Sequence, residues 1–538
     1  MESLHQLEVI IMLLAVVLAL TTIAQKVGIP YPIFLVLGGL VLGVVPGLPP
    51  VTLHPDLVFL VFLPPILWAA AYFTSLREFR QNLRPISLLA VGLVLATSAG
   101  VAAVAHALLP GIGWAEAITL GAIVSPPDAV SATAIGKRLG IPRRVVTILE
   151  GESLVNDATA LVLYRAAVGA VVSGSFALGG TLLDFLYAAV AGTAIGIAVA
   201  WVTRWALCAT EDGFTQIGIT LLSPYIAWVS AESVHASAVL ACVAGGVYLR
   251  QYFSGAVSPA TRLQTRAVWE LLIFVLNGVI FILIGLQLGA LRDAVPAGQF
   301  VPILIAGAWV SATAIVVRFM WVPLAALIPR WLSATLRARD PMPPWSGLFL
   351  ISWTGMRGIV TLAAALALPM TTSTGVPFPF RSEIILISFT VILVTLVLQG
   401  LSLPPIIRLL RLEEDHGLEQ EETMAREHAA TAALNRLDQV IGEDWATSEQ
   451  VERVRLRYSR RLERFARSGL MEQTTTDGVT EVVQRLQHET LTAERLALIG
   501  LRNDGTISDE VLHHLERELD VAALHLGVGE RRVGRKQR

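Results

Sequence analysis

The chain has 538 residues, of which 54% are hydrophobic and only 15% are charged, and its mean hydropathy is +0.65. Soluble domains carry about 25% charged residues, so this composition excludes an ordinary soluble enzyme or a nucleic-acid-binding protein for most of the chain. The formal net charge of −2 conceals an uneven distribution, because residues 412–538 hold 25 of the 42 acidic and 18 of the 40 basic side chains. We therefore place one domain boundary near Arg411, with an apolar domain over 1–411 and a polar tail over 412–538.

Apolar runs of the length that crosses a bilayer as a helix recur from the first residues to about position 410. The first run, "MESLHQLEVIIMLLAVVLAL", lacks a basic start and a clear cleavage site, so we interpret it as a spanning helix and not as a signal peptide. The pattern predicts an all-α membrane protein with about thirteen spans. Their predicted ranges are 7–25, 31–48, 56–75, 85–109, 115–135, 145–172, 179–204, 215–231, 234–250, 267–290, 299–326, 345–368 and 383–409.

The basic residues between these spans alternate regularly. With the N-terminus outside, the inner loops carry fifteen Lys and Arg residues, whereas the outer loops carry only Arg292 and Arg381. Positive residues concentrate in cytoplasmic loops. The sequence therefore predicts an external N-terminus and a cytoplasmic C-terminal tail in the plasma or inner membrane.

The fifth predicted span contains a break, in the stretch "AIVSPPDAVSATAIG". Pro126 and Pro127 remove two backbone donors and leave carbonyl oxygens without helical partners, and Asp128 follows at once. Non-helical backbone is tolerated at membrane depth only inside protein or beside a water-filled cavity. We expect this span to be unwound at a functional site.

The sixth span places several polar groups in apolar surroundings, in "GESLVNDATALVLY" (151–164). On a helix, Ser153 lies one turn before Asp157, and Glu152 lies one turn before Asn156. Hard cations prefer oxygen ligands, and a poorly solvated carboxylate favours its protonated form. Such an acid holds either a proton or a cation, which is the logic of coupled exchange. The alternative is that Glu152 and Asp157 are structural charges paired with arginines.

A second break is expected in the twelfth span, where Gly355 and Gly358 flank Arg357 in "ISWTGMRGIVTLAAALALP". Spans five and twelve occupy matching places if spans 1–6 and 8–13 are two repeats of opposite topology. Paired broken spans in such an inverted repeat point to a transporter's binding site at the membrane midplane. We interpret Arg318, in the eleventh span, as a structural charge.

At these residues the sequence resembles the monovalent cation/proton antiporters, in the branch of the NhaP and NHE sodium/proton exchangers. The resemblance covers about residues 7–410. It rests, in chain order, on "LPPILWAAAY", "SPPDAVSATAIG", "GESLVNDATALVLY", "FVLNGVIFILIGLQL" and "GMRG", which match the family in order and spacing. It implies a fold of thirteen helices, with two crossing unwound helices in a core domain and a second domain that forms a homodimer.

The resemblance also implies roles for single residues. Asp157 would bind the cation, Na⁺ or Li⁺, or the proton, and Asp128 would be the supporting acid. Ser153 and a backbone carbonyl near Pro127 would complete the Na⁺ shell. No cofactor is implied beyond the transported ions.

Three neighbouring residues have implied supporting roles. Asn156 would hold the unwound segment through its amide, and Glu152 would pair with Arg357. An asparagine before the aspartate accompanies electroneutral exchange in this family, which implies one cation for one proton.

The chain departs from the family pattern at two places. Pro127 stands where the family commonly has threonine, and Ala69 follows Trp68 where many members carry an acid. Selectivity among Na⁺, Li⁺ and K⁺ therefore stays open. Two further hypotheses are a cation channel gated by the tail, whose flux would not be tied to protons, and an intramembrane enzyme with Asp128 and Asp157 as an acid pair, which would need no ion.

The remaining features carry less chemistry. Residues 412–538 alternate apolar and charged positions at helical spacing, which predicts about four amphipathic helices in a regulatory tail. We interpret the tail histidines, including His513 and His514, as surface residues of that bundle and not as a pH sensor. The terminal "RRVGRKQR" could touch anionic lipid. Cys208 and Cys242 are expected in the core, without a disulfide or metal cluster, and the chain has no phosphate-binding loop.

Overall fold

The computed structural model describes residues 2–44, 58–128, 141–174, 178–257, 259–293 and 298–410, together with five single positions in the tail. The chain divides into two compact units, 1–414 and 415–538. The tail helices expected from the sequence, with His513 and His514, lie outside the described residues. The first unit, 1–414, contains all of the described residues except those five.

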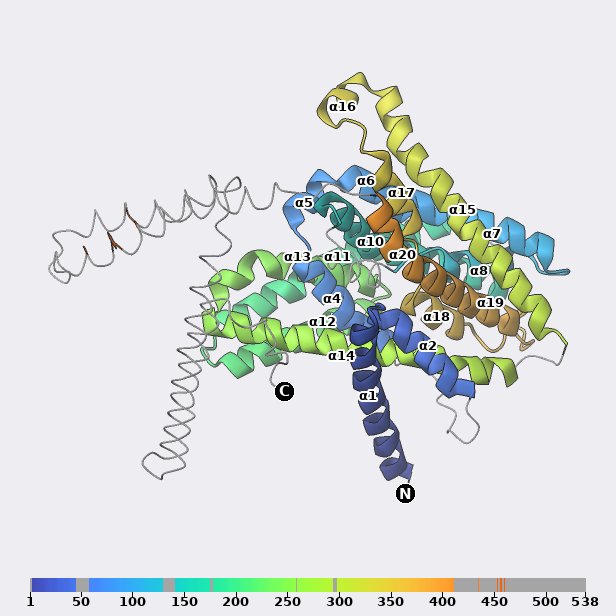
Figure 1. The fold of residues 1–538 in the computed structure, drawn as a ribbon, viewed down its shortest axis with the longest axis horizontal. Helices are drawn as coiled ribbons and strands as arrows, with labels where there is room; N and C mark the ends of the chain where they lie inside the picture. Colours follow the sequence, from blue (N-terminus) through green and yellow to red (C-terminus); the bar gives the residue numbers. More distant parts are fainter. Residues whose placement is uncertain are drawn as a thin grey trace, which may run out of the picture. The chain divides into compact units, whose positions relative to one another are not determined.

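This unit is built from helices in its described residues (Figure 1). Six of them are long and apolar enough to cross a membrane, and five shorter apolar helices accompany them. The helices are α1 (Glu2–Val27), α2 (Tyr31–Val44), η1 (Val58–Phe62), α4 (Leu63–Phe73), α5 (Leu76–Gln81), α6 (Leu83–Ser87), η2 (Leu88–Leu93), α7 (Val94–Leu108), α8 (Trp114–Val124), α10 (Arg143–Ser173), α11 (Leu178–Cys208), α12 (Gly213–Ser233), α13 (Ala238–Ala256), α14 (Pro259–Asp293), α15 (Phe300–Leu332), α16 (Ala334–Arg339), α17 (Trp345–Trp353), α18 (Ile359–Leu366), α19 (Arg381–Val394), η3 (Thr395–Gln399) and α20 (Gly400–Leu410), where η marks a π-helical segment.

Each predicted span contains helix in the described part of the chain, and the differences lie at the edges. The ninth span was predicted from residue 234, but α13 begins at Ala238, because residues 234–237 form a turn in which His235 has a φ of 56°. The thirteen-helix count and the inverted repeat stay predictions. Cys242 is buried as expected, whereas Cys208, expected in the core, is exposed at the end of α11.

Glycines allow several helices to pack with their backbones in close contact. A Cβ on Gly39 of α2 would overlap the Ile282 carbonyl of α14, and a Cβ on Gly285 of α14 would overlap the Val36 carbonyl of α2. The same holds for Gly121 of α8 against the Ser98 carbonyl of α7. Lipid gives no hydrophobic driving force for helices to associate. The close van der Waals packing that small residues allow at such crossings stabilises the helix pairs instead.

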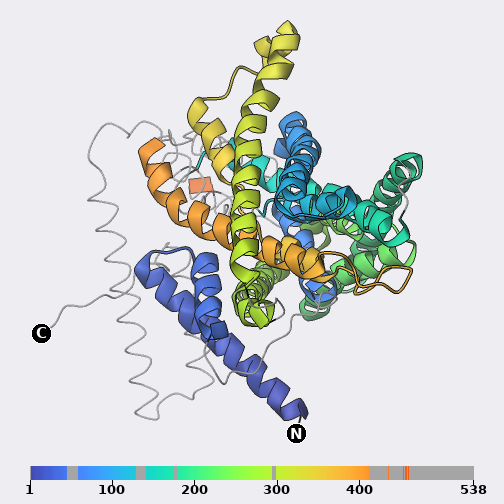
Figure 2. The same cartoon turned by 90° about the vertical axis from the view of Figure 1, so that its right-hand side faces the viewer.

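Both predicted breaks are present, and they meet. Helix α8 ends at Val124, and α17 and α18 are separated by residues 354–358. The backbone N–H of Asp128 donates to the Met356 carbonyl at 2.7 Å, which joins the two non-helical segments. Helix α10 packs on α8, and α19 packs on α18 and α15; in Figure 2, α15 (yellow-green) runs across α19 and α20 (orange).

Candidate functional site

The first broken segment is held by α10. The side-chain amide of Asn156 donates to the Pro127 carbonyl at 2.9 Å. That carbonyl needs a donor because the helix has ended before it. Asn156 is fully buried, and its Oδ1 has no hydrogen-bond partner among the described residues. An amide at this position thus ties α10 to the break and leaves one oxygen unused.

A cavity of about 560 Å³ lies beside this junction. Its walls include Asp128, Ser153 and Asp157, so the structure brings together three of the acids and hydroxyls singled out in the sequence. Asp157 is only 6% exposed. The walls also include Glu150 and the exposed ion pair of Arg266 with Glu270, whose atoms lie 2.8 Å apart. The cavity is thus lined both by exposed charged groups and by a buried carboxylate.

The second broken segment supplies the opposite wall. Gly358 lies directly against the Asp128 carboxylate, which a Cβ at this position would overlap. Thr361, one turn into α18, also lines the cavity; it is 1% exposed, and its hydroxyl has no hydrogen-bond partner in the described structure. The sequence analysis missed Thr361. The signal available there was a hydroxyl three residues after Gly358 in an otherwise apolar half-helix.

The expected pairing of Glu152 with Arg357 is wrong. Glu152 instead forms a two-pronged ion pair with Arg318 of α15, whose Nη1 and Nη2 donate to its carboxylate oxygens at 2.5 and 2.8 Å. Both side chains are almost fully buried. The Nε of Arg318 donates to the Ile351 carbonyl at 2.9 Å. These contacts agree with the prediction that Arg318 is a structural charge and not part of the ion site.

Arg357 has other partners because the helix breaks leave carbonyl oxygens without donors. Its Nε donates to the Val124 carbonyl at the end of α8 at 3.1 Å, and its Nη1 donates to the Gly355 carbonyl. Its own backbone N–H donates to the Thr395 hydroxyl. One guanidinium therefore serves the carbonyls of both broken segments and holds the crossing together.

The groups around the cavity are oxygen donors. Carboxylates, hydroxyls and carbonyls suit hard cations. In the part of the chain that the structure describes, no group of three His, Cys, Asp or Glu residues could hold a transition metal. The carboxylates, hydroxyl and carbonyl in the cavity wall are groups that could coordinate a hard cation near Asp157.

Comparison with known proteins agrees with this geometry. The family model described as "Sodium/hydrogen exchanger, transmembrane" matches residues 11–409. An uncharacterized Na⁺/H⁺ exchanger of Mycobacterium tuberculosis is 34% identical over 97% of this chain and 96% of its own length. A protein of Bacillus pumilus named a sodium, potassium, lithium and rubidium/H⁺ antiporter is 32% identical over 70% of this chain and 57% of its own.

The fold has a counterpart among solved structures. The sodium proton antiporter MjNhaP1 of Methanocaldococcus jannaschii superposes with a TM-score of 0.58 at 18% identity, over 77% of this chain and all of that one. At this identity the likeness concerns the fold alone. Taken with the matched family model and the similarity to the mycobacterial exchanger over nearly its whole length, it shows that this chain belongs to the sodium/hydrogen exchanger family of membrane transporters.

Proposed function

We propose that this protein exchanges Na⁺, or Li⁺, for H⁺ as a secondary antiporter of the plasma membrane. The observation that carries the proposal is a buried acid, Asp157, in the wall of a cavity that is also lined by both broken helices. A charge at this depth is expensive. Such an acid is retained where its binding of ions is the function.

The mechanism follows from competition for one carboxylate. A proton neutralises Asp157 in its poorly solvated position, and a dehydrated cation does the same when oxygen atoms replace its water. Asp128, Ser153 and the Pro127 carbonyl would supply those oxygens, with Asn156 holding the Pro127 segment in place. Because either ligand satisfies the site, one leaves only as the other enters.

The charge balance supports one cation for one proton. Position 156 is a neutral amide already engaged with Pro127, so no second acid precedes Asp157 there. Glu152 is neutralised by Arg318 and lies outside this balance. If Asp157 alone exchanges a proton for the cation and Asp128 keeps one charge state throughout, the transported charge cancels and exchange is electroneutral.

The remaining assignments also belong to this proposal. The loop charges favour an external N-terminus and a cytoplasmic C-terminus. The tail acts as a regulatory domain, and the membrane unit assembles as a homodimer in the lipid bilayer. Transport of ions, not catalysis, is the activity that the family supports.

A second candidate, K⁺/H⁺ exchange on the same site, is favoured by two departures from the family pattern. Pro127 removes a threonine hydroxyl, and Ala69 lines the cavity where many members carry an acid. Selectivity between cations depends on the number and field strength of the coordinating oxygens. A weaker oxygen set reduces the preference for the smaller, more strongly hydrated Na⁺.

The test is a transport assay with purified protein in liposomes that contain a trapped pH dye. Na⁺ or K⁺ gradients are imposed with the membrane potential set to zero or to negative values. We expect a cation-driven pH change that does not depend on the potential, and the two cations decide the selectivity. Dependence on the potential would contradict the one-for-one stoichiometry.

The matched variants are Asp157→Asn, which keeps the shape of the side chain, and Asp212→Asn. Asp212 is an exposed acid that accepts a hydrogen bond from the Thr215 backbone at the start of α12, remote from the cavity lining. The first variant should abolish exchange in a folded protein and the second should retain it. Exchange by a folded Asp157→Asn protein would remove the single-site model.

A further inference from the structure

A second cavity, of about 430 Å³, lies farther along α10. The first cavity is lined by residues of α10 up to Asp157, whereas the second is lined by residues from Ala158 onward. Leu161 and Arg165 form part of its wall, with Trp228 and Glu232 of α12 opposite. The two cavities therefore meet α10 on either side of the level of Asp157.

Two other elements divide between the cavities in the same way. The start of α18 at Gly358 lines the first cavity, and Ala367, just after its end, lines the second. Residues of α4 from Leu63 onward line the first cavity, and Leu60 of η1 lines the second. Three separate segments thus give one consistent division, which places the cavities on opposite sides of the helix crossing.

An ion pair bridges the second cavity. The Arg165 guanidinium of α10 lies 2.9 Å from the Glu232 carboxylate of α12, and both side chains line the cavity. They are 53% and 42% exposed, so both reach the open space of the cavity. Arg165 follows Asp157 by eight residues, roughly 12 Å along the helix. An ionisable side chain inside a spanning segment, such as Arg165 in the predicted sixth span, points by default to a functional site, and Glu232 directly follows the predicted eighth span.

The geometry points to a latch. We propose that the pair Arg165–Glu232 holds α10 against α12 and keeps the second cavity, the vestibule through which Asp157 would be reached from the other side of the membrane, closed to the medium. This inference rests on the proposed exchange function, which requires access from both sides. Arg165 and Glu232 are positioning residues, since neither lines the cavity that holds Asp157.

The expected size of the effect follows from the exposure of the pair. Exposed ion pairs shift an equilibrium by a factor of about two to five. Loss of the latch should therefore raise the fraction of protein open through the second cavity by that factor, without abolishing either state. An exchanger whose equilibrium between the open and closed states is shifted still transports ions. The accessibility of the second cavity to a labelling reagent is therefore a better measurement than the transport rate alone.

The test uses cysteine labelling in the full chain, with Cys208→Ser and Cys242→Ala as background. Leu161→Cys places a thiol in the second cavity, and Phe73→Cys places one in the first. A membrane-impermeant maleimide is applied to intact cells and, separately, to inverted vesicles. We expect the two thiols to label from opposite sides, and labelling of both from one side would overturn the vestibule.

The latch is tested on the Leu161→Cys protein. Arg165→Gln and Glu232→Gln should each raise its labelling rate two- to fivefold, and the swap Arg165→Glu with Glu232→Arg should restore the slow rate. Arg292→Gln is the matched control, because it removes one exposed arginine at the end of α14 that does not line this cavity. Equal labelling rates in all variants would overturn the latch.

Labelling also separates this proposal from the function on which it rests. It requires no transport, so a protein without exchange that shows the expected labelling contradicts antiport but retains the two-sided access. A protein that exchanges ions but labels at equal rates in all variants keeps the function and loses the latch.

Discussion

Thr361 carries a hydroxyl that is buried, lines the same cavity as Asp157, and has no partner in the described structure. An unpaired buried hydroxyl has a cost, and a bound ion would remove it. The oxygen that Pro127 lacks on the first broken segment is thus available from the second. The cavity thus adds Thr361 to the site residues that the family pattern suggests.

Thr361→Val keeps the shape of the side chain and deletes the oxygen. If the hydroxyl binds the cation, the half-saturating Na⁺ concentration of exchange should rise about tenfold, the equivalent of roughly 1.4 kcal/mol. The measurement is the concentration dependence of exchange in liposomes. Thr390→Val is the control, because the Thr390 hydroxyl donates within α19 to the Leu386 carbonyl; an equal rise in both variants would argue against a ligand role for Thr361.

Glu152 and Arg318 form a buried ion pair with nearly ideal two-pronged geometry. Removing one partner of such a pair leaves an uncompensated buried charge, which costs about 3–5 kcal/mol. Glu152→Gln should therefore lower the midpoint of thermal unfolding in detergent markedly. The double variant Glu152→Met with Arg318→Met should recover most of that loss, and failure to recover would show that the pair does more than neutralise itself.

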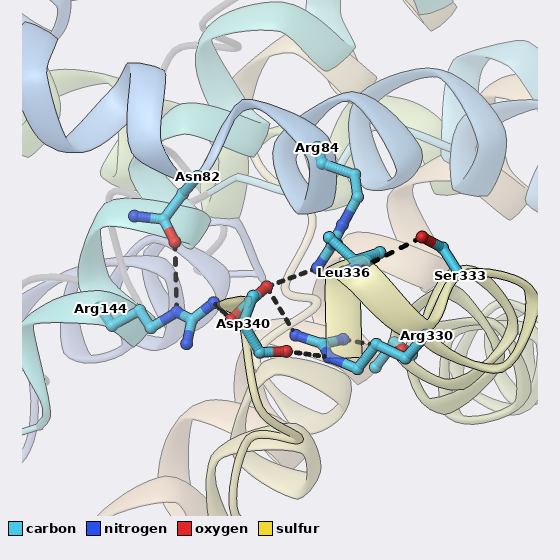
Figure 3. A network of polar contacts seen from close by, with 8 residues as sticks. Asn82, Arg84, Arg144, Arg330, Ser333, Leu336 and Asp340 are labelled. Carbon is cyan, nitrogen blue, oxygen red and sulfur yellow. Dashed lines mark hydrogen bonds and ion pairs between the residues drawn. The ribbon is translucent and has the colours of Figure 1, made fainter. Parts of the chain in front are cut away.

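At the scale of elements, one acid joins the ends of three spans (Figure 3). Asp340, just after α16, accepts from Arg84 at the start of α6 at 2.6 Å, from Arg144 at the start of α10 at 2.9 Å, and from Arg330 at the end of α15 at 2.8 Å. Arg144 also donates to the Asn82 side chain. The network fixes the end of the helix that carries Asp157 relative to α15.

The charge state of Asp340 sets the pH range of this contact. Partial burial alone would raise the pKa of Asp340, but the hydrogen bond and charge of Arg144, with the charges of Arg330 and Arg84, outweigh it and hold that pKa below its ordinary value. Because the pKa of Asp340 is lower in the folded state, its ionised carboxylate stabilises the protein at pH values above its unfolded-state pKa of about 4. That stabilisation is lost as the pH falls from there through the folded-state pKa.

Asp340→Asn should therefore destabilise the protein by about 2 kcal/mol near neutral pH. The difference from the native chain should shrink as the pH is lowered below about 4. Thermal unfolding in detergent as a function of pH measures it, with Arg339→Ala, an exposed neighbour, as control. A difference that stays constant down to pH 3 would contradict the electrostatic account.

The packing of helices in the first unit recurs in matched pairs. Helix α2 packs on α14 and α13 packs on α4, while α1 packs on α2 and α14 and α12 packs on α13 and α4. Under the predicted repeat, α1, α2 and α4 of the first half correspond to α12, α13 and α14 of the second, so each of these contacts has a counterpart. The pattern supports an inverted repeat, which stays a prediction.

At the scale of the whole molecule, the described site lies within the first of the two units. The proposed ion ligands fall between Pro127 and Thr361, and that unit extends to 414. A chain truncated after Arg411 should therefore keep exchange in liposomes, and its pH profile should shift if the tail has the regulatory role proposed for it. The measurement compares pH profiles of the two purified proteins. Complete loss of exchange in a well-folded truncation would assign the tail a part in transport itself.

Much of the fold follows from local sequence. Hydrophobic runs mark the helices, and two prolines and paired glycines mark the breaks, because backbone geometry responds to neighbouring residues. The Asn156–Asp157 stretch likewise suggests, from the sequence alone, which carboxylate is proposed to bind the ion. These features depend on residues close together in the chain.

Which buried charged side chains pair with one another becomes clear only in the tertiary structure. Glu152 pairs with a residue 166 positions away, and nothing in the sequence distinguishes Arg318 from Arg357 as that partner. Arg357 is taken up instead by the carbonyls that the breaks expose. The position of Thr361 in the wall of the first cavity, and the existence of the second cavity, likewise follow only from the tertiary structure. The sequence by itself determined where helices run and break, since that is local chemistry, whereas the choice of partner for each buried charge depends on which distant segments the packing brings together.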